Sequence, residues 1–164
     1  MLVKEDAVNQ NVLVLGLGNT LLCDEGAGVH VINYLQEHHP DLPDVEYLDG
    51  GTLSFTLAGP IENADGLIVV DAAELGAKAG TIRCFQNRDM DDFVGSNRKR
   101  SVHEVSLLDL LAVAYLTERL PQRRALIGIQ PHTVDWSDKP TAEVADAIVL
   151  ASRQVLDILQ EWRQ

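Results

Sequence analysis

Short apolar runs alternate along this chain with longer segments in which apolar residues recur every three or four positions. The short runs predict buried β-strands, because a strand covered on both faces is apolar at consecutive positions. Such runs occupy residues 12–15, 45–48, 67–70, 81–85 and 125–129. The longer segments predict helices. The first carries an apolar stripe at Gly28, Val31, Ile32 and Leu35, and two more extend over about residues 103–116 and 142–162.

The alternation of strands and helices predicts an α/β domain, a three-layer α/β/α sandwich around a twisted, mostly parallel five-stranded sheet. No internal repeat, low-complexity tract or linker divides the chain, so residues 12–164 are expected to form a single domain behind a polar lead of residues 1–11. Ligands bind beyond the carboxyl ends of strands in such sheets. If the first and third strands lie side by side, as in flavodoxin-like sheets, their exit loops share one crevice.

One segment combines a strand exit, a glycine turn, two carboxylates and a helix start. It is Gly-Leu-Gly-Asn-Thr-Leu-Leu-Cys-Asp-Glu-Gly-Ala-Gly-Val at residues 16–29. A dinucleotide fingerprint requires a glycine where this chain has Leu21, and a phosphate loop requires a Lys that the segment lacks. Metal or proton chemistry by Asp24 and Glu25 is therefore favoured over phosphate binding, while a purely structural turn before an acidic helix start stays open.

The charge balance narrows the classes of partner. With 25 acidic and 13 basic side chains the formal net charge is −12, which argues against nucleic acid or an anionic membrane as a partner. No apolar stretch has the length of a signal peptide or a membrane span. Cys23 and Cys84 form no Cys-x-x-Cys motif, and Cys23 is expected to be a small packed residue. A cytoplasmic protein is expected.

Two further residues extend the candidate site. Asp71 ends an apolar run, where it either caps the next turn or acts as a ligand or base at a strand tip. Ser101-Val-His-Glu104 fits a capping box, which would put His103 in a first helical turn. Two carboxylates, Glu25 and Asp71, together with one imidazole would suit a divalent cation, although their sequence spacing does not establish that they meet.

Several loops are weaker candidates. Asp49-Gly50-Gly51-Thr52 follows the second strand and forms a turn that could also contact a substrate. His132 follows the last strand and is a reserve ligand, with a loop histidine of no role favoured. Arg98-Lys99-Arg100 is favoured as a solvated loop over a surface that steers an acidic partner. The chain has neither the second histidine of a zincin motif nor a Gly-x-Ser-x-Gly, so its motifs support no familiar protease mechanism.

The order of motifs resembles the nickel-iron hydrogenase maturation endopeptidases. The segment at residues 16–29 is followed by Asp49-Gly-Gly-Thr52, Val69-Val-Asp-Ala72 and Ser101-Val-His-Glu104, and the similarity runs from about Val12 to the final helix. The resemblance implies a twisted sheet flanked by helices. It also implies an endopeptidase that removes a short C-terminal extension from the precursor of the hydrogenase large subunit after nickel has been inserted.

The resemblance also implies roles for individual residues. The metal-contacting positions of the family fall on Glu25, Asp71 and His103, which would recognise nickel presented by the precursor; another divalent cation could occupy the site in vitro. Glu25 or Asp71 would act as the base, and Asp24 would cap the helix and orient Glu25. We expect the protein to act as a monomer.

Two other functions remain open. A nickel-dependent chaperone that binds the precursor without cutting it would use the same three ligands and leave the precursor mass unchanged. A small nucleotide-binding module would use Gly16, Gly18 and Asp49, but Leu21 and the acidic loop count against it.

Overall fold

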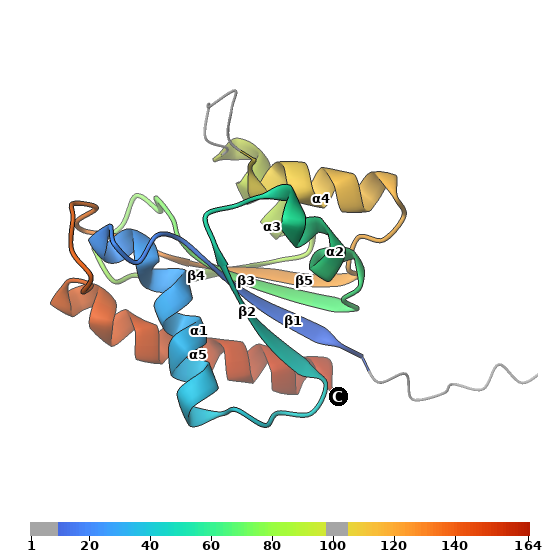
Figure 1. Ribbon diagram of the computed structural model, residues 1–164, viewed down its shortest axis with the longest axis horizontal. Helices are drawn as coiled ribbons and strands as arrows, with labels where there is room; N and C mark the ends of the chain where they lie inside the picture. Colours follow the sequence, from blue (N-terminus) through green and yellow to red (C-terminus); the bar gives the residue numbers. More distant parts are fainter. Residues whose placement is uncertain (1–9, 98–104) are drawn as a thin grey trace, which may run out of the picture.

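The computed structural model describes residues 10–97 and 105–164, which form a five-stranded sheet with helices on both faces (Figure 1). The strands are β1 (Val12–Leu17), β2 (Val45–Gly51), β3 (Gly66–Ala72), β4 (Ile82–Gln86) and β5 (Arg123–Ile129). Their order across the sheet is β2-β1-β3-β5-β4, with only β4 antiparallel to its neighbour. The first and third strands are adjacent, as the flavodoxin-like arrangement requires.

The helices form the two outer layers. They are α1 (Ala27–His38), α2 (Ala58–Glu62), α3 (Arg88–Ser96), α4 (Leu107–Leu116) and α5 (Ala142–Trp162), with short 3-10 turns η1 (Cys23–Gly26) and η2 (Phe55–Leu57). Figure 1 shows α1 and α5 on one face of the sheet and α2, α3 and α4 on the other. The predicted α/β/α sandwich is therefore confirmed. None of the helices in the described ranges has the length and apolar character needed to cross a membrane.

The apolar strands fill both layers because successive side chains point to opposite faces of a sheet. Along β1, Val12 and Val14 pack into the core under α1 and α5, whereas Leu13 and Leu15 pack into the core under the other three helices. All four side chains are buried. This is why the strand is a continuous apolar run rather than an alternating one.

Each predicted strand is present; β1, β2 and β3 extend two or three residues past the predicted ends, β4 is shifted by one residue, and β5 begins two residues earlier than predicted. The short helices α2 and α3 were not predicted. The first has a single turn and contains Pro60, and the second opens on Arg88 and Asp89 with only Met90 and Val94 buried. The first segment is too short to show a helical stripe, whereas the second carries Met90, Phe93 and Val94 at helical spacing, a signal that the sequence analysis did not use.

The predicted start of the helix that ends at Leu116 is wrong. Helix α4 begins at Leu107, and its capping box is formed by Ser106 and Asp109: the Ser106 Oγ accepts from Asp109 N at 3.2 Å, and Asp109 Oδ2 accepts from Ser106 N at 2.9 Å. The sequence offers this box and the one at residues 101–104, and Ser106 stands directly before the apolar face that the core buries. Residues 101–104 lie outside the described ranges.

Candidate active site

A cavity of about 830 Å³ opens beyond the carboxyl ends of β1, β2 and β3. Its walls come from the loop after β1, the loop after β2, the end of β3, and the facing parts of α3 and α4. Glu25 and Asp71 both line it. The cavity thus lies where ligands bind in sheets of this type, at the exits of two adjacent parallel strands.

Glu25 reaches the cavity because the chain after β1 turns back sharply. Gly18 has φ of +128°, and a Cβ at this position would collide with the Glu25 carbonyl oxygen. The Asn19 side chain closes the turn, since its Oδ1 accepts a hydrogen bond from Leu21 N at 2.9 Å. Only glycine permits this φ and this close approach, so the turn fixes where Glu25 stands.

Gly28 lets α1 lie directly on the sheet. A Cβ on Gly28 would collide with the carbonyl oxygens of Val70 and Leu17, which belong to β3 and β1. The first turn of α1 is therefore seated over the gap between the two strands whose ends form the cavity. The glycines of residues 16–29 thus serve close packing of backbone on backbone.

The buried Asp24 carboxylate stabilises the loops next to the site. Its side chain is fully buried, and its two oxygens accept hydrogen bonds from the backbone N–H groups of His132 (2.9 Å), Thr133 (3.0 Å) and Thr141 (2.7 Å) and from the Thr141 hydroxyl. Burial alone would raise the pKa of this carboxyl, but these hydrogen bonds outweigh burial and lower the pKa below 3.8.

The expectation that Asp24 caps α1 is wrong. The cap position of α1 is Gly26, which makes no side-chain cap hydrogen bond, and η1 has none either. The carboxylate instead joins the turn that carries Glu25 to the loop between β5 and α5. Next to it, burial raises the pKa of the Cys23 thiol, which agrees with a packed residue rather than a nucleophile.

Asp71 stands at the tip of β3, where it is paired in register with Gly128 of β5. The side chain is half-buried and faces the same cavity as Glu25. The predicted meeting of these two carboxylates at one crevice is confirmed by the adjacency of β1 and β3.

The Asp49-Gly50-Gly51-Thr52 turn contributes to the cavity only in part. Gly51 and Thr52 line it, and Asp49 and Gly50 are not among the lining residues. The exposed Asp49 side chain stabilises the turn, because its Oδ1 accepts from Gly51 N at 2.8 Å, while Gly51 O accepts from Gly18 N. A Cβ on Gly50 would press on core leucine side chains.

Of the histidines and basic residues predicted near the site, the structure describes only His132. His103 and Arg98-Lys99-Arg100 lie outside the described residues. The His132 side chain is exposed, contacts the Thr133 hydroxyl through Nδ1 at 2.9 Å, and is not among the residues that line the cavity. The structure uses the His132 backbone as a donor to Asp24 and gives no support to its side chain as a ligand.

Comparison with known proteins identifies the family. The model of the HycI hydrogenase maturation protease family matches residues 29–158. The chain belongs to the hydrogenase maturation protease family. A hydrogenase 2 maturation protease of Escherichia coli is 36% identical over 152 residues, which cover 92% of this chain and 91% of that protein. The hydrogenase expression/formation protein HupD of Rhodobacter capsulatus is 36% identical over 154 residues, or 93% of this chain and 73% of that protein.

A solved structure supports the same assignment. The hydrogenase maturating endopeptidase HybD from Escherichia coli superposes with a TM-score of 0.84 at 35% identity, over 92% of this chain and 93% of that one. The resemblance seen in the motifs is thereby confirmed, and the chain is placed among proteases that act in hydrogenase maturation.

The donor set of this maturation protease fits part of a divalent-cation site. Glu25 and Asp71 supply carboxylate oxygens to one cavity, and such oxygens bind hard and borderline divalent cations. Within residues 10–97 and 105–164, no three His, Cys, Asp or Glu side chains are grouped so that they could hold a metal. The predicted third ligand, His103, lies outside those ranges.

Sequence reasoning missed several polar residues at the cavity. Asn19, Glu74 and Asn97 line it. Glu74 is held by Gln130, whose Nε2 donates to Glu74 Oε2 at 3.1 Å and whose Oε1 accepts from Leu75 N at 2.6 Å. Asn19 lies inside the glycine motif, which could have drawn attention to it, whereas Glu74 and Asn97 have no local signal in the sequence.

Proposed function

We propose that this maturation protease removes a C-terminal extension from the nickel-containing precursor of the large subunit of a nickel-iron hydrogenase, after nickel has been inserted. The observation that carries the proposal is the placement of Glu25 and Asp71 on one cavity at the exits of adjacent strands. Family membership and the motif resemblance support the choice of substrate.

The size of the cavity suits a peptide segment. At about 830 Å³ it falls in the range of roughly 300–1,000 Å³ that is usual for small-molecule pockets. A few residues of an extended tail fit such a space and a folded domain does not. The tail of the precursor would therefore enter the cavity while the body of the precursor stays outside.

Nickel belongs to the substrate in this proposal. When bound, a divalent cation supplies a Lewis acid that polarises a peptide carbonyl. The carboxylates of Glu25 and Asp71 bind the precursor's metal and orient the tail, and His103 is proposed as the third ligand. One of the two carboxylates takes the proton of the attacking water. Precursor without nickel would lack this point of attachment, so cutting would depend on completed metal insertion.

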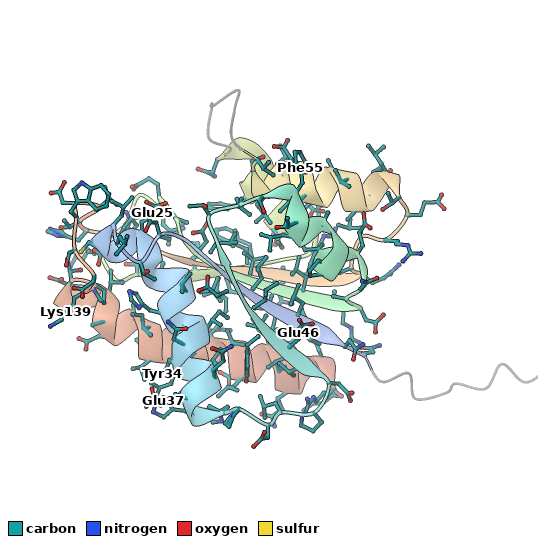
Figure 2. All side chains as sticks on the ribbon, viewed as in Figure 1. Glu25, Tyr34, Glu37, Glu46, Phe55 and Lys139 are labelled. Carbon is teal, nitrogen blue, oxygen red and sulfur yellow. The ribbon has the colours of Figure 1, made fainter. Side chains whose placement is uncertain are left out.

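The test is the intact mass of a tail-bearing large subunit after incubation with the protein. We expect loss of one C-terminal peptide from nickel-loaded precursor, no loss from metal-free precursor, and no loss with Glu25→Gln or Asp71→Asn. The matched control is Glu37→Gln, the same substitution at an exposed position of α1: Glu25 lies in η1, directly before that helix, and Figure 2 shows Glu37 toward the end of α1 that is remote from Glu25.

Other outcomes would reject the proposal in distinct ways. Precursor that is bound but never cut would favour the nickel-dependent chaperone. Equal cutting of metal-free precursor would remove the role of nickel. Full activity of Glu25→Gln would place the chemistry elsewhere.

A further inference from the structure

Two loops beside the cavity are fastened into one unit. Cys23 N donates to Ser137 O at 2.9 Å, Ser137 N donates to Leu21 O at 3.0 Å, and Asp24 N donates to Thr133 O at 3.0 Å. The buried Asp24 carboxylate adds its hydrogen bonds to the same loop. The loop between β5 and α5 is therefore tied along its length to the turn that carries Glu25. Side chains on it are presented from a defined backbone.

This unit displays large apolar side chains to solvent. Trp136 is 80% exposed, and Val134 and Leu21 are each 56% exposed. We call these three residues the loop-pair patch. Burial of apolar side chains is favourable, so a backbone that holds them outward leaves binding energy for another surface. Trp is also the residue type most enriched where protein interfaces derive their affinity.

Charged side chains next to the patch indicate the chemistry of its partner. Asp135 and Asp138 are both exposed and stand on either side of Trp136 in the chain; exposed Lys139 follows, so the loop carries two acidic side chains and one basic side chain. The protein as a whole carries a formal charge of −12. A surface that offers apolar side chains bordered by Lys or Arg matches this arrangement, because opposite charges at the edge of an interface favour encounter and register.

The patch adjoins the cavity wall through Leu22, which lines the cavity and is bridged to Ser137, the residue after Trp136. Leu22 and Glu25 line the cavity, and Leu21, which precedes them, belongs to the patch. Lys139, at the far end of the same loop, lies at the same end of the molecule as Glu25 (Figure 2). In the proposed complex, the folded body of a protein whose tail occupies the cavity lies against the surface next to that cavity.

We propose that the loop-pair patch docks the folded body of the hydrogenase precursor through an apolar surface bordered by basic side chains, while the precursor's tail occupies the cavity. This inference rests on the proposed function, since it assigns a second contact to the same substrate. Docking and cutting are then separate: the patch sets affinity for the precursor, and Glu25 and Asp71 act on the tail.

The experiment compares processing of nickel-loaded precursor by the wild type, Trp136→Ala and Leu116→Ala. Leu116 is a matched control, because it is 78% exposed but ends α4, at the opposite end of the molecule from the β5–α5 loop (Figure 1). We expect Trp136→Ala to raise KM about 10-fold or more with kcat unchanged, as loss of a central interface Trp does. Leu116→Ala is expected to match the wild type. Both variants remove exposed side chains, and unchanged unfolding curves would confirm that both fold.

A second pair of measurements tests the charged border. The double variant Asp135→Asn with Asp138→Asn is expected to raise KM less than Trp136→Ala does and to weaken the dependence of KM on salt concentration, because exposed charges act mainly on the rate of encounter.

The oligomeric state of the wild type and Trp136→Ala is measured by light scattering. A wild-type dimer that Trp136→Ala makes monomeric would show that the patch binds a second copy of this chain and would overturn the proposal.

The outcomes separate the two proposals. If the wild type cuts the precursor and Trp136→Ala cuts it with the same KM, the docking proposal is wrong and the proposed function stands. If the wild type neither cuts nor binds the precursor, both are wrong.

Discussion

Replacement of Asp24 by Asn tests whether one buried carboxylate holds together the loops beside the active-site cavity. The side chain is fully buried and serves the N–H groups of His132, Thr133 and Thr141 and the Thr141 hydroxyl. Asn has the same shape but a single acceptor oxygen. Whichever way the amide turns, its NH₂ group faces at least one backbone N–H that has lost its acceptor.

The expected cost follows from counting these donors. In the better orientation the amide oxygen replaces Oδ2 and keeps the bonds from His132 and Thr133, and the Thr141 N–H loses its acceptor. An unpaired buried N–H costs about 1–3 kcal/mol, and loss of charge assistance weakens each remaining bond by about 1 kcal/mol. The smaller cost of burying a neutral amide offsets part of this. The free energy of unfolding should therefore fall by about 3 kcal/mol, and Tm by about 6–12 °C.

Urea unfolding at pH 7 measures the effect. The matched control is Asp135→Asn, which removes an exposed carboxylate from the same loop and should change stability by less than about 0.5 kcal/mol. A double-mutant cycle with Thr141→Val isolates the hydroxyl contact: Thr141→Val should cost about 1 kcal/mol less in the Asp24→Asn background, since the bond from the hydroxyl to the Oδ2 position then lacks charge assistance. Asp24→Asn unfolding within about 0.5 kcal/mol of the wild type would refute the assignment of Asp24 as an anchor.

Three further changes test the packing and the helix ends. Gly28→Ala should destabilise the folded protein by about 3 kcal/mol or prevent folding, because the new Cβ collides with the Val70 carbonyl oxygen. Gly95→Ala, in helix α3 with open space around it, should be neutral or stabilising. Equal urea midpoints for the two variants would contradict this prediction. Ser106→Ala should lower stability by about 1 kcal/mol in the same assay through loss of the α4 capping box, and no change would reject that cap. The buried His30 Nε2 has no hydrogen-bond partner among the described residues, and burial lowers the pKa of this imidazole below 6.5. Folding stability should therefore fall as pH drops from 7 to 5, because the unfolded chain takes up a proton that the folded protein does not. His30→Leu should reduce this loss of stability, and identical pH profiles of the variant and the wild type would disprove the prediction.

Much of the fold can be predicted from the sequence because its signals are local. The strands that are buried on both faces appear as apolar runs, and α5 appears as a stripe that matches its observed bounds of Ala142–Trp162. The start of α4 could not be settled in this way, since two capping boxes five residues apart are equally acceptable to the local chain. In the structure the box at Ser106 caps α4, and Leu107 and Leu110 directly behind it pack into the core.

The candidate site also contains residues that could be predicted from the sequence and one that could not. Glu25 and Asp71 were predictable because each follows an apolar strand, and adjacency of β1 and β3 then brings them to one cavity. The role of Asp24 was not predictable, since its donors lie 108 to 117 positions away in the sequence. A carboxylate at a helix start has the same local pattern whether it caps that helix or anchors a distant loop.

The sequence by itself determined the layered α/β fold and the two carboxylates that follow strands, because apolar periodicity and the glycine turn act between near neighbours, and the resemblance of its motifs indicated the family. Only the tertiary structure decided that β4 runs antiparallel at the edge, that Asp24 ties two loops together, and that Trp136 is exposed on the loop tied to the turn of Glu25. These features depend on which distant segments meet, and that is fixed by the packing of the whole chain rather than by any residue's immediate neighbours.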